Sequence, residues 1–113
     1  MKDWWSKVDD IAVDELNWRT SGSKDNDDWC FSKGSPQGQD CNIELNAATY
    51  DELVEQLQNW CESFDVSYET YIWLDKWGHG MNGAPYDMRD LYNDMEWFLN
   101  EAYKLLDALK EAR

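Results

Sequence analysis

Three cysteines and one histidine are the residues of this 113-residue chain best suited to act as nucleophiles or metal ligands. A zinc site formed by Cys30, Cys41, Cys61 and His79 is possible by count, but the spacings of 11, 20 and 18 residues match no compact zinc motif. A Cys–His nucleophile pair is a second possibility, although a histidine in the glycine-rich segment 78–84 is adequately explained as a loop residue. We therefore predict no metal site and no cofactor.

Carboxylates are the other chemistry-bearing groups, because 24 Asp and Glu outnumber 10 Lys and Arg and give a formal net charge of −14. No pair of them stands out as a general acid and base, and the chain contains no phosphate-binding glycine motif, nucleophile elbow or metalloprotease motif. The acids at 25–28 lack the glycine and glutamate of an EF-hand loop. We predict that the protein is not an enzyme, and that its charge prevents direct binding to nucleic acid or anionic lipid.

The acids are unevenly distributed along the chain. Between Thr49 and Asp75 there are seven acids and no Lys or Arg, so no base close in sequence neutralises them. A solvated helix face that serves only solubility is the alternative explanation. A second group of acids is expected to form a ridge on the last helix: Asp87, Asp90, Asp94 and Glu101. We predict that the following carboxylates bind a partner: Asp51, Glu52, Glu55, Glu62, Asp65, Glu69, Asp75, Asp90 and Asp94.

Aromatic residues are unusually frequent, with eight Trp, six Tyr and three Phe. A core of this size is hard to build with all eight Trp fully buried, so we expect a few on the surface, where aromatic side chains anchor protein–protein contacts. If the segment after Ser67 is helical, Trp73 and Trp77 lie on a different side from Tyr68 and Tyr71. We predict that Trp73 and Trp77 contact a partner.

The N-terminal half is expected to contain a short helix, a loop and a hairpin. Residues 4–16 have apolar side chains at helical spacing, although two of them also alternate as in a strand. Residues 20–28 are polar and indicate an exposed loop. Alternating apolar residues predict antiparallel strands at 28–33 and 40–46, joined by a tight turn that contains one Pro and two Gly.

The cysteines are expected to be free thiols. Strand alternation places Cys30 and Cys41 on opposite faces of the hairpin, which disfavours a disulfide between them. The N-terminus lacks the apolar stretch of a signal peptide, and no apolar run is long enough to span a membrane. We therefore predict a cytoplasmic location, where thiols stay reduced.

Three helices are expected in the C-terminal half. Thr49 and the three residues after it form a capping box, which begins a helix with an apolar stripe over 49–64. A second helix is expected over 67–77 and a third, capped by an aspartate, over 87–112. Together these elements predict one α+β domain over residues 1–113, in which a small antiparallel sheet packs against three to four helices.

Part of the sequence resembles a group of small acidic proteins from phages, mobile elements and gut bacteria. The segment 32–40 (SKGSPQGQD) is the most specific part of this likeness, and 64–66 (FDV) and 83–85 (GAP) also resemble the group. The similarity covers about residues 27–110. Size and acidity are more loosely similar to phage anti-defence proteins, the anti-restriction and anti-CRISPR inhibitors, and the string 91–95 (LYNDM) resembles part of one Cas9 inhibitor.

The looser resemblance implies an inhibitor of a host defence system in the bacterial cytoplasm. In this hypothesis the protein is an acidic DNA mimic whose carboxylates occupy a basic nucleic-acid channel of a CRISPR effector nuclease or restriction enzyme. Such a contact weakens as salt rises. The alternative hypothesis is a non-enzymatic protein–protein interaction module, or a homodimer, whose exposed Trp and Tyr make the contacts.

Overall fold

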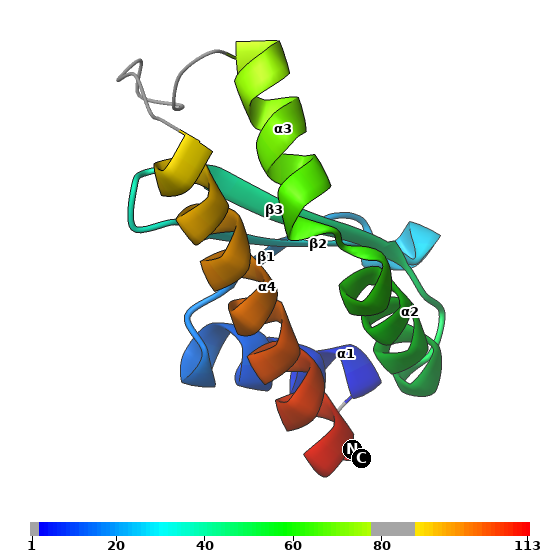
Figure 1. The fold of residues 1–113 in the computed structure, drawn as a ribbon. Coiled ribbons are helices and arrows are strands. Elements are labelled where there is room, and N and C mark those ends of the chain that lie inside the picture. Colours follow the sequence, from blue (N-terminus) through cyan, green and yellow to red (C-terminus); the bar gives the residue numbers. More distant parts are fainter. Residues whose placement is uncertain (1–2, 78–87) are drawn as a thin grey trace.

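A computed structural model describes residues 3–77 and 88–113, and for residues 73–77 it describes the backbone only. The described residues form three antiparallel strands and four α-helices (Figure 1). This arrangement confirms the predicted α+β class.

The sheet is a meander of three strands in the order β1-β2-β3. The strands are β1 (Arg19–Ser21), β2 (Asp28–Gly34) and β3 (Asp40–Asn46), so the predicted hairpin is confirmed. Apolar side chains alternate with polar ones along β3, and opposite strands match in register, as at Phe31 and Ile43. One face of the sheet is therefore buried and the other is exposed.

The cysteines of the hairpin follow the predicted alternation. Cys41 is buried on the covered face, whereas Cys30 is half-buried and lies opposite Glu44. Cys30, Cys41 and Cys61 are all free thiols.

The N-terminal segment is helical, as predicted, but it changes its winding halfway. Helix α1 (Trp4–Asp9) continues directly into a π-helical stretch, η1 (Asp10–Glu15). The segment ends at Asn17, whose φ of 62° lies in the left-handed region, where Asn is one of the more tolerant residues.

The prediction of a continuous loop over 20–28 is partly wrong. Strand β1 pairs antiparallel with β2, with Arg19 opposite Ser32, and a short 3₁₀ helix, η2 (Lys24–Asn26), follows. The strand was hidden because its three residues are polar edge-strand residues without an apolar alternation.

Helix α2 (Tyr50–Ser63) begins as its capping residue predicts. The Thr49 hydroxyl accepts a hydrogen bond from the Glu52 backbone N–H at 3.1 Å. Four residues of the predicted stripe are buried: Leu53, Val54, Leu57 and Cys61. Burial of this stripe against α4 and β3 stabilises the helix in its place.

Replacing Thr49 with alanine is expected to lower the free energy of unfolding by about 1 kcal/mol, because it leaves the Glu52 N–H without its cap. Urea unfolding monitored by circular dichroism measures this effect. Thr49→Ser retains the hydroxyl and is the matched control. An unfolding free energy for Thr49→Ala equal to that of the unchanged protein would show that the cap contributes nothing.

Helix α3 (Val66–Trp77) begins one residue before the predicted start at Ser67. Its cap is Asp65, whose Oδ1 accepts a hydrogen bond from the Tyr68 backbone N–H at 3.0 Å. The acidity of Asp65 is thus partly a consequence of helix capping.

Helix α4 (Met88–Glu111) forms the axis of the fold. It packs against α2, α3 and η1, and α3 lies beside its N-terminal half (Figure 1). The predicted cap, Asp87, lies outside the described residues. In the parts of the chain that are described, no helix has the length and apolar character needed to cross a membrane.

Candidate functional site

Three carboxylates lie on one exposed face of α2. Asp51, Glu55 and Glu62 follow one another at spacings of four and seven residues, which places them on the same side of the helix. Asp51 forms a 3.1 Å ion pair with Arg113. Glu52, in the first turn, is half-buried and lies off this face.

The lysines and arginines of the fold lie mostly elsewhere. Ion pairs between described residues join five of them to acids: Arg19–Asp40, Lys24–Asp9, Lys33–Glu101, Lys104–Glu101 and Arg113–Asp51. Glu55, Glu62 and Asp65 have no such ion pair with any Lys or Arg of the described chain, and all three are exposed. We call these three residues the acidic surface. Arg113 lines the same hollow as Glu55 but pairs with Asp51, so the three carboxylates keep their charge exposed to solvent.

Glu69 differs from these acids because it points inward. It lies one turn after Asp65 on α3 and is half-buried. Burial raises the pKa of Glu69, and the neighbouring Asp65 charge raises it further. Within the described chain, the Glu69 carboxylate has no hydrogen bond and no ion pair that would offset this burial.

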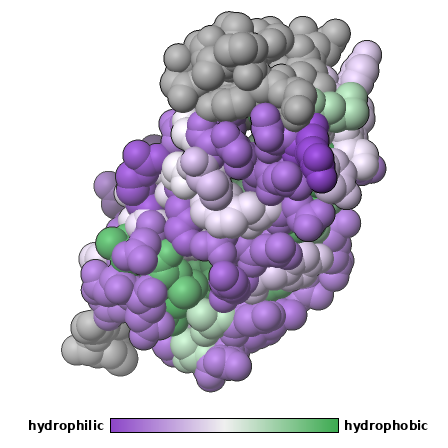
Figure 2. Space-filling model, turned by 60° about the vertical axis from the view of Figure 1, so that its left-hand side comes forward, coloured by the Kyte–Doolittle hydropathy of each residue, from purple (hydrophilic) through white to green (hydrophobic). Residues whose placement is uncertain are grey.

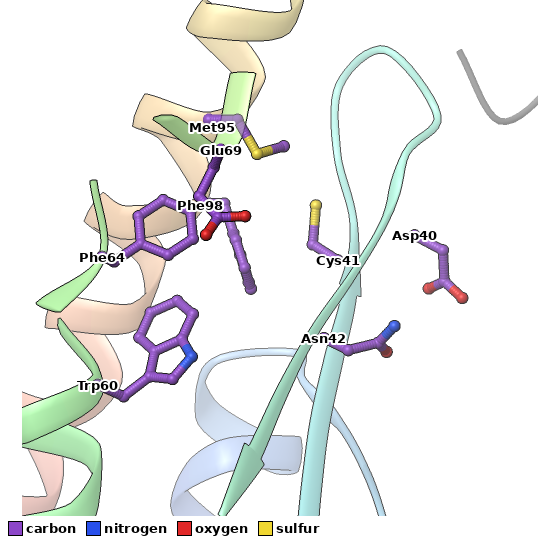
Figure 3. Close-up of a pocket in the computed structure, with 8 residues that line it drawn as sticks. All are labelled: Asp40, Cys41, Asn42, Trp60, Phe64, Glu69, Met95 and Phe98. Atoms are coloured by element: carbon purple, nitrogen blue, oxygen red, sulfur yellow. The ribbon is translucent and has the colours of Figure 1, made fainter. Parts of the chain in front are cut away.

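Glu69 contributes to a pocket of about 250 Å³ between β3 and the helices α2, α3 and α4 (Figure 3). One wall is a cluster of three aromatic rings. The Trp60 ring centroid lies 4.8 Å from that of Phe64 and 5.4 Å from that of Phe98, and the two Phe rings lie 5.9 Å apart. The remaining lining residues are Asp40, Cys41, Asn42 and Met95. We call this space the aromatic pocket.

The two buried thiols are poor nucleophiles. Burial, reinforced by the charges of Asp94 and Asp40, raises the pKa of Cys41 to about 12. Burial also raises the pKa of Cys61 to about 11, with Asp107 and Glu62 adding to the shift and Lys110 opposing it. Both thiols are therefore protonated at neutral pH, whereas the thiolate is the reactive form.

Iodoacetamide labelling of the folded protein at pH 7.5 is expected to modify Cys30 well before the two buried thiols, which are inaccessible and protonated. Mass spectrometry of timed peptide digests measures the three rates, and the denatured protein is the control in which all three react. Labelling of Cys41 as fast as Cys30 would show that the pocket wall around Cys41 opens readily.

The acidic ridge predicted on α4 is wrong at Asp94. This residue is only 2% exposed and accepts a 2.7 Å hydrogen bond from the Ser35 hydroxyl. The backbone N–H of Gln37 also donates to it. Asp94 therefore anchors the β2–β3 turn to α4 and cannot contact a partner.

The neighbouring acids of α4 also fit a ridge poorly. Glu101 forms ion pairs with Lys33 at 2.7 Å and Lys104 at 2.8 Å. Burial would raise the pKa of Glu101, but the hydrogen bonds and charges of Lys104 and Lys33 outweigh it and lower the pKa. Asp90 is half-buried.

The prediction that not all tryptophans can be fully buried is confirmed for the described side chains, although tyrosines are the more exposed aromatic residues. Among the described side chains, Trp18 and Trp29 are buried, and four others are half-buried: Trp4, Trp5, Trp60 and Trp97. On the part of α3 whose side chains are described, Tyr68 is 59% exposed and Tyr71 is 61% exposed. Tyr68 and Tyr71 are three residues apart on α3, so they lie on one side of the helix as predicted, and both are exposed.

Several predicted residues lie outside the described parts of the structure. The side chains of Trp73, Asp75 and Trp77 belong to this group, although their backbone is part of α3. His79 and the segment 78–84 lie there as well. The described residues contain no group of three or more His, Cys, Asp or Glu that could hold a metal ion.

The space-filling view in Figure 2 shows a face on which hydrophilic residues predominate, with hydrophobic residues gathered in its lower part. A partner that binds this face would therefore contact mainly charged and polar groups.

Comparison with known proteins finds no matching family model, no matching curated protein and no matching solved structure.

Proposed function

We propose that this protein inhibits a host nucleic-acid-targeting defence system by binding a basic nucleic-acid channel with its acidic surface. The single observation that carries the proposal is that Glu55, Glu62 and Asp65 are exposed and lack ion pairs with the described Lys and Arg. Five bases of the described chain already pair with other acids, four of them away from α2 and the fifth, Arg113, with Asp51. A basic channel supplies the missing positive charge.

The spacing of the carboxylates supports competition with nucleic acid. Glu62 lies seven positions after Glu55 on α2, which corresponds to roughly 10 Å along the helix axis. Phosphates follow one another at about 3.4 Å of axial rise along one DNA strand, so the two carboxylates span a distance of about three nucleotides. Lysines and arginines placed to bind such a backbone can bind these carboxylates instead. The looser similarity in size and acidity to phage anti-defence proteins supports a defence nuclease as the target.

A second candidate function rests on Tyr68 and Tyr71. Two exposed tyrosines one turn apart on α3 form an aromatic contact surface of the type found at protein interfaces. In this alternative the protein is an interaction module or homodimer, and the carboxylates serve solubility. It predicts that Tyr68→Ala with Tyr71→Ala abolishes self-association in sedimentation experiments, while substitutions in the acidic surface do not affect it.

Inhibition of purified nucleases tests the main proposal. The probes are a guide-loaded Cas9-type nuclease and a set of restriction endonucleases, each incubated with the protein before labelled duplex DNA is added. We expect the protein to reduce DNA binding and cleavage by at least one of them, and excess DNA to relieve the inhibition. Undiminished DNA binding by every nuclease at a large molar excess of the protein would contradict the proposal.

A further inference from the structure

We propose that the aromatic pocket holds an arginine side chain of the basic partner, with the guanidinium against the Trp60 and Phe64 rings and its N–H groups directed at the Glu69 carboxylate. This inference rests on the proposed function, because that function supplies a partner rich in arginine. It assigns to the pocket a specific contact that the acidic surface alone does not provide.

The aromatic rings and the Glu69 carboxylate border the same space. The Glu69 carboxylate points from α3 into the space between the ring cluster and β3 (Figure 3). Aromatic faces attract cations, and the attraction grows when the cation is removed from water. A carboxylate beside the same space adds a charged hydrogen-bond acceptor. The pocket thus has the two features that bind an organic cation.

The other lining groups leave Glu69 as the carboxylate that faces the space. Asp40 points away from the rings (Figure 3), and its carboxylate pairs with Arg19 at 2.7 Å. The thiol of Cys41 is protonated at neutral pH, as described above, and Met95 is uncharged. A cation in the pocket would therefore be bound chiefly by Glu69 and the rings.

Arginine fits this environment better than lysine. Its guanidinium is planar, stacks on aromatic rings and can donate two parallel hydrogen bonds to one carboxylate. An ammonium group is more strongly hydrated and loses more on entering a pocket walled by three rings. The pocket also adjoins the acidic surface, since Asp65 lies close enough to Glu69 to raise its pKa. One partner surface can therefore reach both.

Titration of the full chain with short peptides tests the pocket without knowledge of the partner. Each peptide carries one central arginine, lysine or citrulline, and the indole N–H signal of Trp60 in a ¹H–¹⁵N spectrum reports binding. Citrulline has nearly the shape of arginine without the charge. We expect a saturable shift with the arginine peptide, weaker binding of the lysine peptide and no saturation with the citrulline peptide.

Glu69→Gln is expected to weaken binding of the arginine peptide about tenfold, because it removes a charged hydrogen-bond partner while retaining the shape of the side chain. Glu44→Gln, on the exposed face of the sheet, is the matched control and should leave binding unchanged. Equal binding of the citrulline and arginine peptides, equal binding of the lysine peptide, or unchanged affinity in Glu69→Gln would each overturn the inference.

The experiments distinguish failure of the arginine-pocket inference from failure of the proposed function. If Glu69→Gln loses the arginine peptide while no nuclease is inhibited, the pocket is supported and the proposed function is contradicted. If a nuclease is inhibited equally by the unchanged protein and by Glu69→Gln, the function is supported and the pocket inference is overturned.

Discussion

Replacing Glu55 and Glu62 with lysine and Asp65 with asparagine is expected to weaken binding to the target nuclease about 100-fold. The three changes shift the local charge by five units on a surface without ion pairs to the described bases. At roughly 0.5 kcal/mol for each unit of charge facing a basic channel, the loss amounts to about 2.5 kcal/mol, which is close to 100-fold. Fluorescence anisotropy of the labelled nuclease measures the change.

Asparagine is the appropriate replacement at position 65 because Asp65 has two roles. Its Oδ1 caps α3 through the Tyr68 N–H, so lysine would remove the cap as well as the charge. Asparagine removes the charge and keeps an oxygen that accepts the same hydrogen bond. The variant therefore reports on charge and leaves the start of α3 intact.

A variant with the same charge change elsewhere is the control. Asp14→Lys, Glu15→Lys and Asp25→Asn also shift the net charge by five units, at exposed positions of η1 and η2. Net charge alone would weaken both variants equally. The proposal requires the control to retain most of its affinity, and equal losses would show that binding depends on overall charge and not on this surface.

Removal of the Asp94 carboxylate is expected to lower the stability of the fold more than Thr49→Ala does. Asp94→Ala eliminates the hydrogen bonds from the Ser35 hydroxyl and the Gln37 N–H and leaves the buried Ser35 hydroxyl without this acceptor. Losses of this kind cost about 3 kcal/mol in total. The turn is further connected, since the Gln39 N–H donates to the Ser35 hydroxyl oxygen at 2.8 Å. Urea unfolding of Asp94→Ala and of the unchanged protein measures the difference.

Asp94→Asn separates the hydrogen bonds from the charge, because it keeps one acceptor oxygen. Burial raises the pKa of Asp94, although the hydrogen bonds from Ser35 and Gln37 oppose the shift and the Asp90 charge adds to it. The folded state then binds more protons than the unfolded state at pH values just above the usual aspartate pKa of ~3.9. This contribution to stability falls as the pH rises through that window and is absent in Asp94→Asn.

The raised pKa of Asp94 predicts the direction in which the stability of the protein changes with pH. As the pH rises from about 4 to 7, we expect the unchanged protein to lose stability relative to Asp94→Asn, while Asp94→Ala stays the least stable of the three. Glu101 acts in the opposite direction, since its lowered pKa contributes stability that is lost at acid pH. An Asp94→Ala unfolding midpoint equal to that of the unchanged protein would refute the anchor.

The elements that could be predicted from the sequence are those whose signal is local. The strands β2 and β3 follow from their alternating apolar residues, and α2 follows from the Thr49 cap and its stripe. Strand β1 could not be predicted in this way, because three polar residues at an edge are defined only by their pairing with β2.

The burial of Asp94 depends on a residue 59 positions away, Ser35, so no local pattern reveals its partner. A signal was nevertheless present. Asp94 lies three residues after Leu91 and four before Phe98, both buried, so it lies within the apolar stripe of α4. A lone acid in such a stripe indicates a buried, hydrogen-bonded carboxylate.

One part of the candidate site could be predicted from the sequence, and the other could not. The exposed face of α2 was predictable because helical spacing alone aligns Glu55 with Glu62. The aromatic pocket was not, because it forms only where Trp60 and Phe64 of one segment meet Phe98 of another. Sequence reasoning assigned Trp60 and Phe64 to the core stripe, yet both are half-buried and line the pocket.

Displacement of duplex DNA from an inhibited nuclease, measured at increasing salt, tests the central claim most directly. The protein is titrated into a complex of the nuclease and labelled DNA at salt concentrations from about 50 to 200 mM, a range over which phosphate-like contacts weaken strongly. We expect displacement whose affinity falls steeply with salt and is weakened about 100-fold in Glu55→Lys/Glu62→Lys/Asp65→Asn. Inhibition without displacement of DNA, or an affinity that stays constant across this range, would contradict it.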